Sequence, residues 1–192
     1  MNKIGVLILF LGAIISSYAN DNEFADTAKY IPYSDTVVVT WNDFRGEESS
    51  TCALTYCQVS LLSQIEGCNV VFDLKTYMVK EKSMKLKDHY GDELLNHEKA
   101  HFQITEIYSR YMRKEISEIK LKELSDINKE VNQIFNKYSK QSREFQILYD
   151  KETKHSQDKD KQRKWEKKVN SLLKETSKYS DTKITVEFDC KK

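Results

Sequence analysis

The sequence contains few residues that break or bend a chain, with five glycines and one proline among 192 residues. Loops that wrap phosphate groups need several glycines at short spacing, so this composition leaves few places for such a loop. Neither sign of charge is in excess, because 31 basic residues stand against 30 acidic residues. We therefore expect no phosphate-binding loop of this type and no nucleic-acid partner.

Long apolar runs are also missing, except for an almost unbroken one at residues 4–15 that follows a short positive start. The small residues Ser17 and Ala19 suit cleavage after Ala19. The run is too short to be a comfortable membrane span, so we expect residues 1–19 to be a secretory signal peptide and not an uncleaved anchor. Residues 20–192 would then form one exported domain, periplasmic or secreted, with no stable membrane span.

Cysteine is scarce, and no CxxC pair is present among Cys52, Cys57, Cys68 and Cys190. In an oxidising compartment an even number of cysteines indicates two disulfides, and four cysteines allow three pairings. A zinc site of four thiolates is the alternative, but the lack of CxxC and the predicted export argue against it. A disulfide from Cys190 back to the N-terminal part of the chain would tie its two ends together.

Alternating apolar residues predict strands at both ends of the mature chain. Residues 36–41 are rich in β-branched side chains, and residues 53–62 and 68–79 have the pattern of a hairpin. The alternation is disturbed at Thr76, where a bulge or an early strand end is possible. Residues 184–188 alternate again and predict a short closing strand.

Between these strands the spacing changes to three and four residues, which predicts helices. One helix starts at Asp92, and a second pattern over residues 116–138 either continues it or follows a kink. Residues 150–162 contain no apolar side chain and predict a polar loop or a frayed helix, before a last helix at 165–173. A coiled-coil adaptor built on residues 92–140 is a weaker interpretation, because packing within one domain explains the tyrosines and isoleucines better.

The first helical segment carries the motif H-E-x-x-H at residues 97–101. Residues four apart on a helix lie one above the other, so His97 and His101 can bind one zinc ion from the same side. Glu98 is turned by about 100° around the axis, which keeps it from being a ligand but leaves it close to the ion. It could then act as a general base towards a water activated by zinc.

A catalytic zinc needs a third protein ligand and an open position. His89, eight residues before the motif, and His155, well downstream, are the two remaining histidines. Glu106 lies nine residues after His97, which places it on the opposite side of the helix. We expect Glu106 to pair with Arg110, at i,i+4 spacing, or to support the site indirectly.

The segments LLNHEKAHFQITEIYSR and YDKETKH, with Gln162-x-x-Trp165, resemble a bacterial family of predicted secreted zinc-dependent proteases catalogued as a domain of unknown function. The resemblance covers most of the mature chain and includes a weaker N-terminal match at Trp41-x-x-Phe44-x-Gly46. The family pattern implies zinc ligands at His97, His101 and His155, with His155 favoured over His89. It also makes Tyr149 a candidate for stabilising an oxyanion or for a supporting hydrogen bond. Ser156 stands where the family commonly has a glycine.

These observations predict an α+β protein of zincin-like architecture, in which a small N-terminal sheet packs on the helix that carries the motif. Further helices and a short C-terminal strand complete it. The expected function is that of an exported zinc-dependent metallopeptidase acting on a peptide or protein, with Glu98 and Tyr149 as catalytic residues. The alternative is a non-catalytic envelope-associated binding protein with a structural metal or none. Substrate specificity and oligomeric state stay open.

Overall fold

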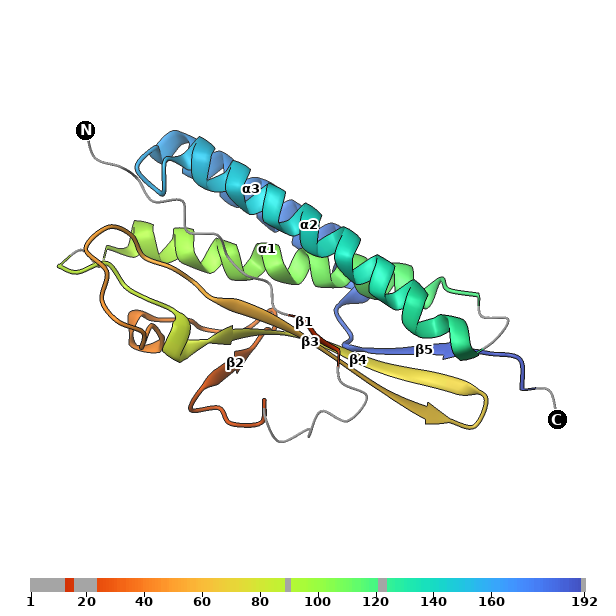
Figure 1. The fold of residues 1–192 in the computed structure, drawn as a ribbon. Coiled ribbons are helices and arrows are strands. Elements are labelled where there is room, and N and C mark those ends of the chain that lie inside the picture. The colour runs from red at the N-terminus through yellow and green to blue at the C-terminus, as the bar shows by residue number, and fades with distance from the viewer. Residues whose placement is uncertain (1–12, 16–23, 89–90, 121–123, 191–192) are drawn as a thin grey trace.

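The computed structural model of the protein describes residues 13–15, 24–88, 91–120 and 124–190 (Figure 1). The described chain forms one mixed sheet with three long helices on one of its faces, so the predicted α+β class is confirmed. The strands are β1 (Ala13–Ile15), β2 (Tyr30–Pro32), β3 (Cys57–Glu66), β4 (Asn69–Val79) and β5 (Lys183–Glu187); the α-helices are α1 (Asp92–Ser117), α2 (Ile127–Thr153) and α3 (Lys159–Glu175); and the 3-10 helices are η1 (Trp41–Asp43), η2 (Lys80–Lys82), η3 (Leu124–Asp126) and η4 (Ser177–Tyr179).

The sheet is organised around β4, which pairs with three other strands in antiparallel orientation. Its long partner is β3, and Gly67 forms the turn between them with a φ of 61° that a glycine adopts without strain. On the other edge of β4, β2 pairs near one end and β5 near the opposite end. β1 pairs with β3 in parallel orientation.

The predicted hairpin is present, but two details of the strand prediction are wrong. Thr76 pairs with Val59 in an unbroken register, so β4 has no early end at this position. Residues 36–40 form no strand and lead instead into η1, where the backbone N–H of Thr40 donates to the Asp43 carboxylate at 2.9 Å. This local cap satisfies the backbone N–H of Thr40 without a partner strand. The β-branched composition of the segment does not reveal such a cap.

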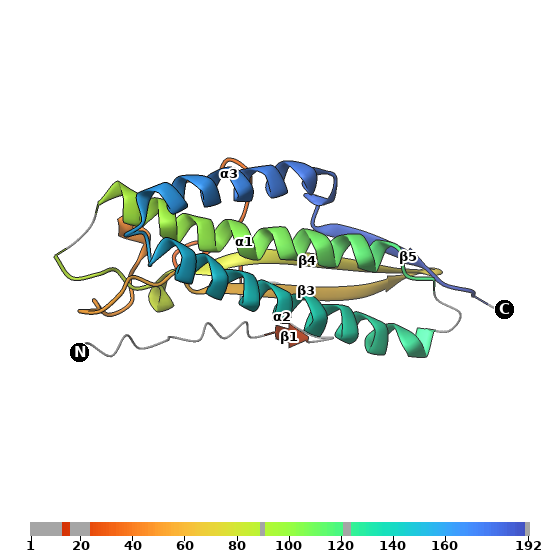
Figure 2. The same cartoon turned by 90° about the horizontal axis from the view of Figure 1, so that it is seen from above.

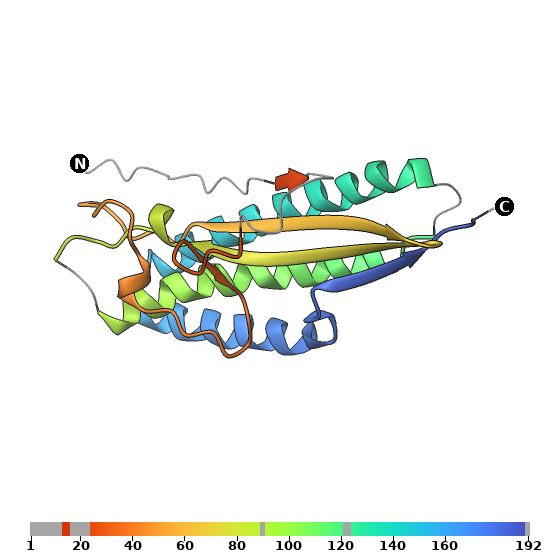
Figure 3. The ribbon, with the colours of Figure 1, turned by 90° about the horizontal axis from the view of Figure 1, so that it is seen from below.

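The helices form a layer with α1 in the middle, lying along the sheet and flanked by α2 and α3 (Figure 2). α1 ends at Ser117 and α2 begins at Ile127, so the second helix does not continue the first. The stretch expected to be a polar loop is mostly helical, since α2 runs to Thr153 and α3 begins at Lys159. No described helix covers the opposite face of the sheet (Figure 3).

Apolar side chains fill the space between the sheet and the helices and hold α1 in place. Leu74 and Phe72 of β4 pack in one cluster with Met112 of α1 and Phe135 of α2. A second cluster joins the three helices near the start of α1, with Ile104, Ile107, Trp165 and Val169 among its buried members. The helix that carries the motif is therefore packed on several sides, which fixes its position.

A buried ionic cluster adds a polar anchor to α1. The Glu106 carboxylate accepts hydrogen bonds from Arg110 Nε at 2.9 Å and from Arg113 Nη1 at 2.7 Å, and its other oxygen accepts from Thr76 at 2.8 Å. The guanidinium groups also donate to the carbonyls of Leu173 and Tyr179. All three charged side chains are buried, so the cluster joins α1 to β4, to the last turns of α3 and to η4.

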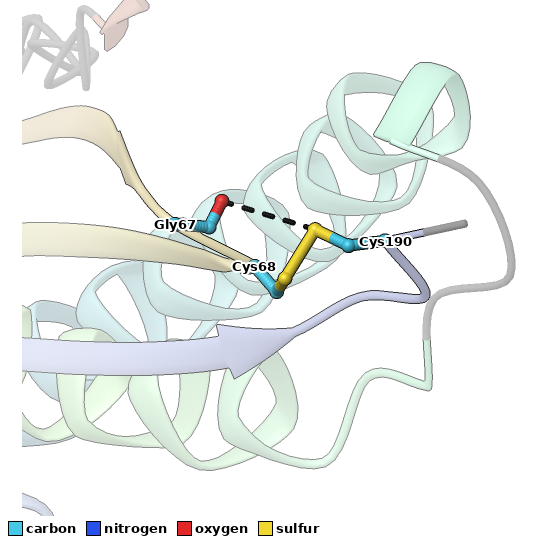
Figure 4. Close-up of a disulfide and its surroundings, with 3 residues drawn as sticks. All are labelled: Gly67, Cys68 and Cys190. Atoms are coloured by element: carbon cyan, nitrogen blue, oxygen red, sulfur yellow. Dashed lines mark hydrogen bonds between the residues drawn. A yellow bond between two sulfur atoms is a disulfide. The ribbon is translucent and has the colours of Figure 1, made fainter. Parts of the chain in front are cut away.

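One disulfide connects Cys68, beside the β3–β4 turn, to Cys190 after β5, at a sequence separation of 122 (Figure 4). The Cys190 sulfur lies 3.9 Å from the Gly67 carbonyl oxygen. The expectation of a second disulfide is wrong, because Cys52 and Cys57 are free thiols. Cys57 points into the core, where burial raises its pKa to about 12, whereas Cys52 lies in a surface turn.

Two predictions, the signal peptide and the role of His89, fall wholly or largely outside the described residues. Of the expected signal peptide, residues 1–12 and 16–19 are not described, and only the short strand β1 is. His89 also lies outside the described residues. Within the described ranges, none of the helices combines the length and the apolar character that a membrane span needs.

Candidate metal centre

The two motif histidines lie on the buried side of α1, one helical turn apart. His97, Glu98 and His101 are each almost fully buried. The facing wall comes from the last turns of α2, where Gln146, Tyr149, Asp150 and Thr153 recur at three- and four-residue spacing on one side of the helix. The packing of α1 against α2 thus brings a second set of polar side chains opposite the motif.

The histidine nitrogens converge on one oxygen of Asp150. His97 Nε2 lies 3.1 Å and His101 Nε2 lies 2.9 Å from Asp150 Oδ1. His155 Nδ1 approaches the same oxygen at 3.7 Å. The donor atoms of His97, Asp150 and His155 all lie within 4.8 Å of one another. His101 does not belong to this mutually close group, and it joins the centre through its contact with Asp150, a carboxylate that the sequence did not indicate.

Two glutamines bind the far sides of the histidine rings. His97 Nδ1 lies 3.1 Å from Gln162 Oε1, and His101 Nδ1 lies 3.0 Å from Gln146 Oε1. The Gln162 amide nitrogen donates to Glu166, so its oxygen is the atom that faces the imidazole and accepts from it. Each Nδ1 then carries a proton, and both Nε2 atoms face the centre between α1 and α2, where an Nε2 that loses its proton can bind a metal ion.

At this centre the histidines and Asp150 shift the pKa values of one another. Burial lowers the pKa of His101, but the neighbouring Asp150 carboxylate outweighs burial and raises this pKa to about 9. In Asp150, burial raises the pKa, but His101 and His97 outweigh it and hold the pKa well below its usual range. Without a metal, the carboxylate and a protonated imidazole therefore satisfy each other. A cation that binds here has to replace that proton.

Glu98 is held beside the histidines by a residue from the sheet side. Thr55, which precedes β3, donates its hydroxyl to Glu98 Oε2 at 2.8 Å and also lies 3.0 Å from the Glu98 carbonyl oxygen. Both residues are buried, so the carboxylate has a defined orientation. Among the described residues, the Thr55 hydroxyl contacts only one of the two carboxylate oxygens, and the other oxygen can accept a proton.

Tyr149 is fully buried behind the first histidine. Its ring stacks on His97 with centroids 4.5 Å apart, and its hydroxyl lies 3.3 Å from the His97 carbonyl oxygen. The same hydroxyl accepts from Gln162 Nε2 at 2.9 Å. These contacts are those of a residue that positions His97 and Gln162, which was one of the two roles considered for Tyr149.

His155 reaches the centre from an unusual stretch of backbone. Lys154, His155 and Ser156 are consecutive and all have φ between 51° and 70°, in the left-handed region. The first of them ends α2, and the N–H of His155 donates to the Asp150 carbonyl at 3.0 Å. The His155 side chain stays about half exposed, in contrast to the buried histidines of α1.

Ser156→Gly should raise the free energy of unfolding by up to about 1 kcal/mol. A left-handed conformation costs a non-glycine residue about 1–2 kcal/mol, and the extra freedom of glycine in the unfolded chain offsets about 0.5–1 kcal/mol of the gain. Urea unfolding of the metal-free protein measures the difference. Gln157→Gly is the matched control, because Gln157 is exposed and lacks a positive φ, and it should lose about 0.5–1 kcal/mol. Equal losses in both variants would contradict the strain at Ser156.

Four residues of the centre were not identified from the sequence: Thr55, Gln146, Asp150 and Gln162. Asp150 and Gln162 are the two ends of the stretch that has no apolar residue and was expected to be loop or frayed helix. A usable signal was present, since Gln146, Tyr149, Asp150 and Thr153 share one helix face. Glu106 lies away from the centre in the ionic cluster with Arg110, as its angular position on α1 predicts.

A family model described as "Bacterial protein of unknown function (DUF922)" matches residues 17–156. The matched range contains the motif on α1, the polar face of α2 and His155, but it ends before Gln162. No curated protein and no solved structure matches the chain.

Proposed function

The chain belongs to this bacterial family, and we propose that it is an exported zinc-dependent hydrolase, a metallopeptidase of zincin-like architecture that acts on peptides or proteins. The observation that carries the proposal is the arrangement of the two buried histidines. Both Nε2 atoms lie about 3 Å from the same carboxylate oxygen, Asp150 Oδ1, and both Nδ1 atoms are bound by glutamine oxygens. Two buried imidazoles with this orientation are suited to holding a transition-metal ion.

The side chains around the histidines have separate tasks in this proposal. His97 and His101 hold the ion, and Gln162 and Gln146 keep their rings in the required tautomer. A bound zinc ion would supply a Lewis acid that polarises a carbonyl group and lowers the pKa of water. Glu98, oriented by Thr55, accepts a proton from the attacking water and passes it to the leaving group.

Export is supported by chemistry in two parts of the chain. The first residues have the charge and length pattern of a signal peptide. The Cys68–Cys190 disulfide fits an oxidising compartment, where such bonds form and persist. Both features support the proposal that the mature chain is periplasmic or secreted.

The zinc content of the purified mature chain tests the proposal. We expect about one zinc ion per chain, as a single site requires. His97→Ala and His101→Ala should each reduce the bound zinc to background, measured by atomic emission after dialysis. Lys99→Ala, on the same helix between the two histidines, is the control and should keep the zinc. Unchanged zinc in either histidine variant would contradict the site.

A second candidate is a non-catalytic envelope-associated binding protein with a structural metal. The specific observation in its favour is that three histidine nitrogens approach one carboxylate oxygen, which makes four potential donors, and a closed set of four protein ligands is typical of structural zinc. The two functions differ in the behaviour of Glu98, which matters for hydrolysis and is irrelevant to a structural ion.

A further inference from the structure

We infer that Asp150 is a zinc ligand that forms the permanent set with His97 and His101, and that His155 is an exchangeable fourth ligand that closes the site at rest. This inference rests on the proposed zinc site, and it names the permanent ligands and the ligand that leaves. It changes the ligand set implied by the family resemblance, in which His155 completes the site.

The distances place Asp150 where a ligand would stand. Zinc in a tetrahedral site lies roughly 2.0–2.2 Å from nitrogen and oxygen donors, which spaces those donors about 3.3 Å apart. Asp150 Oδ1 lies 3.1 Å from His97 Nε2, 2.9 Å from His101 Nε2 and 3.7 Å from His155 Nδ1. These distances bracket the expected spacing, so Asp150 Oδ1 lies as close to each of the three nitrogens as a second ligand of one zinc ion would.

The alternative role for Asp150 is to orient a histidine ring through the nitrogen that points away from the metal. Gln162 and Gln146 already have that role. Supporting partners bind the ring nitrogen that points away from the metal. In both histidines that nitrogen is Nδ1, which is occupied by Gln162 or Gln146. Asp150 instead contacts Nε2, the metal-facing atom, of both rings. Its negative charge would also offset half of the charge of a divalent zinc ion, which two neutral imidazoles cannot do.

Asp150 and His155 differ in how firmly they are held. Asp150 belongs to the regular part of α2, and its carbonyl oxygen accepts the N–H groups of Lys154 and His155. His155 lies beyond the helix in the left-handed turn, and its side chain is about half exposed. It is also the most distant of the three nitrogens from Asp150 Oδ1. A ligand with these properties can leave the ion and make room for water or substrate at low cost.

Zinc affinity separates the two roles. In competition with a chromophoric chelator, Asp150→Asn should weaken zinc binding by more than about 100-fold, because loss of a supporting group alone costs about 10–100-fold. His155→Ala should weaken it by about tenfold or less, and Asp160→Asn, an exposed carboxylate on α3, should have no effect. Asp150→His, which restores a donor at the same position, should return the affinity to within about tenfold of native. Circular dichroism checks that each variant is folded.

The number of imidazoles bound to zinc can be measured by spectroscopy without a substitution of Asp150. Zinc X-ray absorption should show three imidazoles in the native chain and two in His155→Ala. In the cobalt-substituted proteins, azide should bind His155→Ala at least about tenfold more tightly than native, because His155 no longer occupies the open position. Gln157→Ala should behave as native.

Three results would overturn the inference. The first is native zinc affinity in Asp150→Asn, the second is two imidazoles in the native site, and the third is equal azide binding with and without His155. In each of these cases, zinc that still depends on His97 and His101 would leave the proposed function standing. A native chain that binds no zinc would overturn both.

Discussion

Glu98→Gln should keep about one zinc ion per chain and lower hydrolysis of denatured casein by about 10²–10⁴-fold, the usual contribution of a general base. Glutamine has the same shape as glutamate, and its amide oxygen can accept the Thr55 hydroxyl as the carboxylate does. It cannot accept a proton at neutral pH. The histidines stay in place because neither of them is hydrogen-bonded to Glu98 in the described contacts.

The control for this result is Glu93→Gln on the first turn of α1. Glu93 is exposed and pairs with Lys159 on the surface, so its loss should change neither zinc content nor rate. Hydrolysis at the native rate in Glu98→Gln would show that Glu98 is not the base. Loss of zinc together with activity would show that Glu98 shapes the metal site. Absence of hydrolysis in the native chain would favour the non-catalytic alternative.

The motif helix was predictable because two independent patterns agree over the same residues. The apolar spacing predicts a helix from Asp92, and α1 begins there. The motif places His97 and His101 on the apolar side, and both are buried in the structure. Helical angle alone also separates Glu106 from the histidines. Periodicity thus predicts which face of α1 is buried and which residues share it.

The side chains that α2 and α3 contribute to the site were not predictable in the same way. The region from Asp150 to Gln162 contains no apolar residue, and hydrophobic spacing is the signal that identifies a buried helix. Here burial is achieved by polar groups that satisfy each other: Gln162 binds His97 and Tyr149, and Asp150 binds both histidines. Such a network becomes visible only when α1, α2 and α3 are placed side by side.

The cysteine pairing also depends on contacts between distant segments, which the sequence does not reveal. Their even number and the predicted compartment suggested two disulfides, but only Cys68 and Cys190 meet, where the β3–β4 turn lies beside the end of β5. Cys57 lies on the inward face of β3 and is buried among apolar side chains. Strand register decides which side chains face Cys57, and a count of cysteines contains no information about register.

Glu106→Gln should lower the free energy of unfolding by about 3–5 kcal/mol, the cost of removing one partner from a buried ionic cluster. The substitution keeps the shape of the side chain but leaves Arg110 and Arg113 without their shared buried countercharge. Asp35, the other acid on Arg110, is largely exposed and reaches only that guanidinium. Urea unfolding of the metal-free chain measures the loss without interference from zinc.

Glu115→Gln on the same helix is the matched control for Glu106. Glu115 pairs with Lys137 at the surface, where ion pairs contribute between about 0 and 1 kcal/mol, so its loss should be small. Because Glu106 lies away from the metal centre, its variant should bind zinc with native affinity at temperatures where it is folded. A loss no larger than that of Glu115→Gln would mean that Asp35 and the carbonyls of Leu74, Leu173 and Tyr179 satisfy the guanidinium groups without Glu106. The cluster would then orient α1 on the sheet without stabilising the fold.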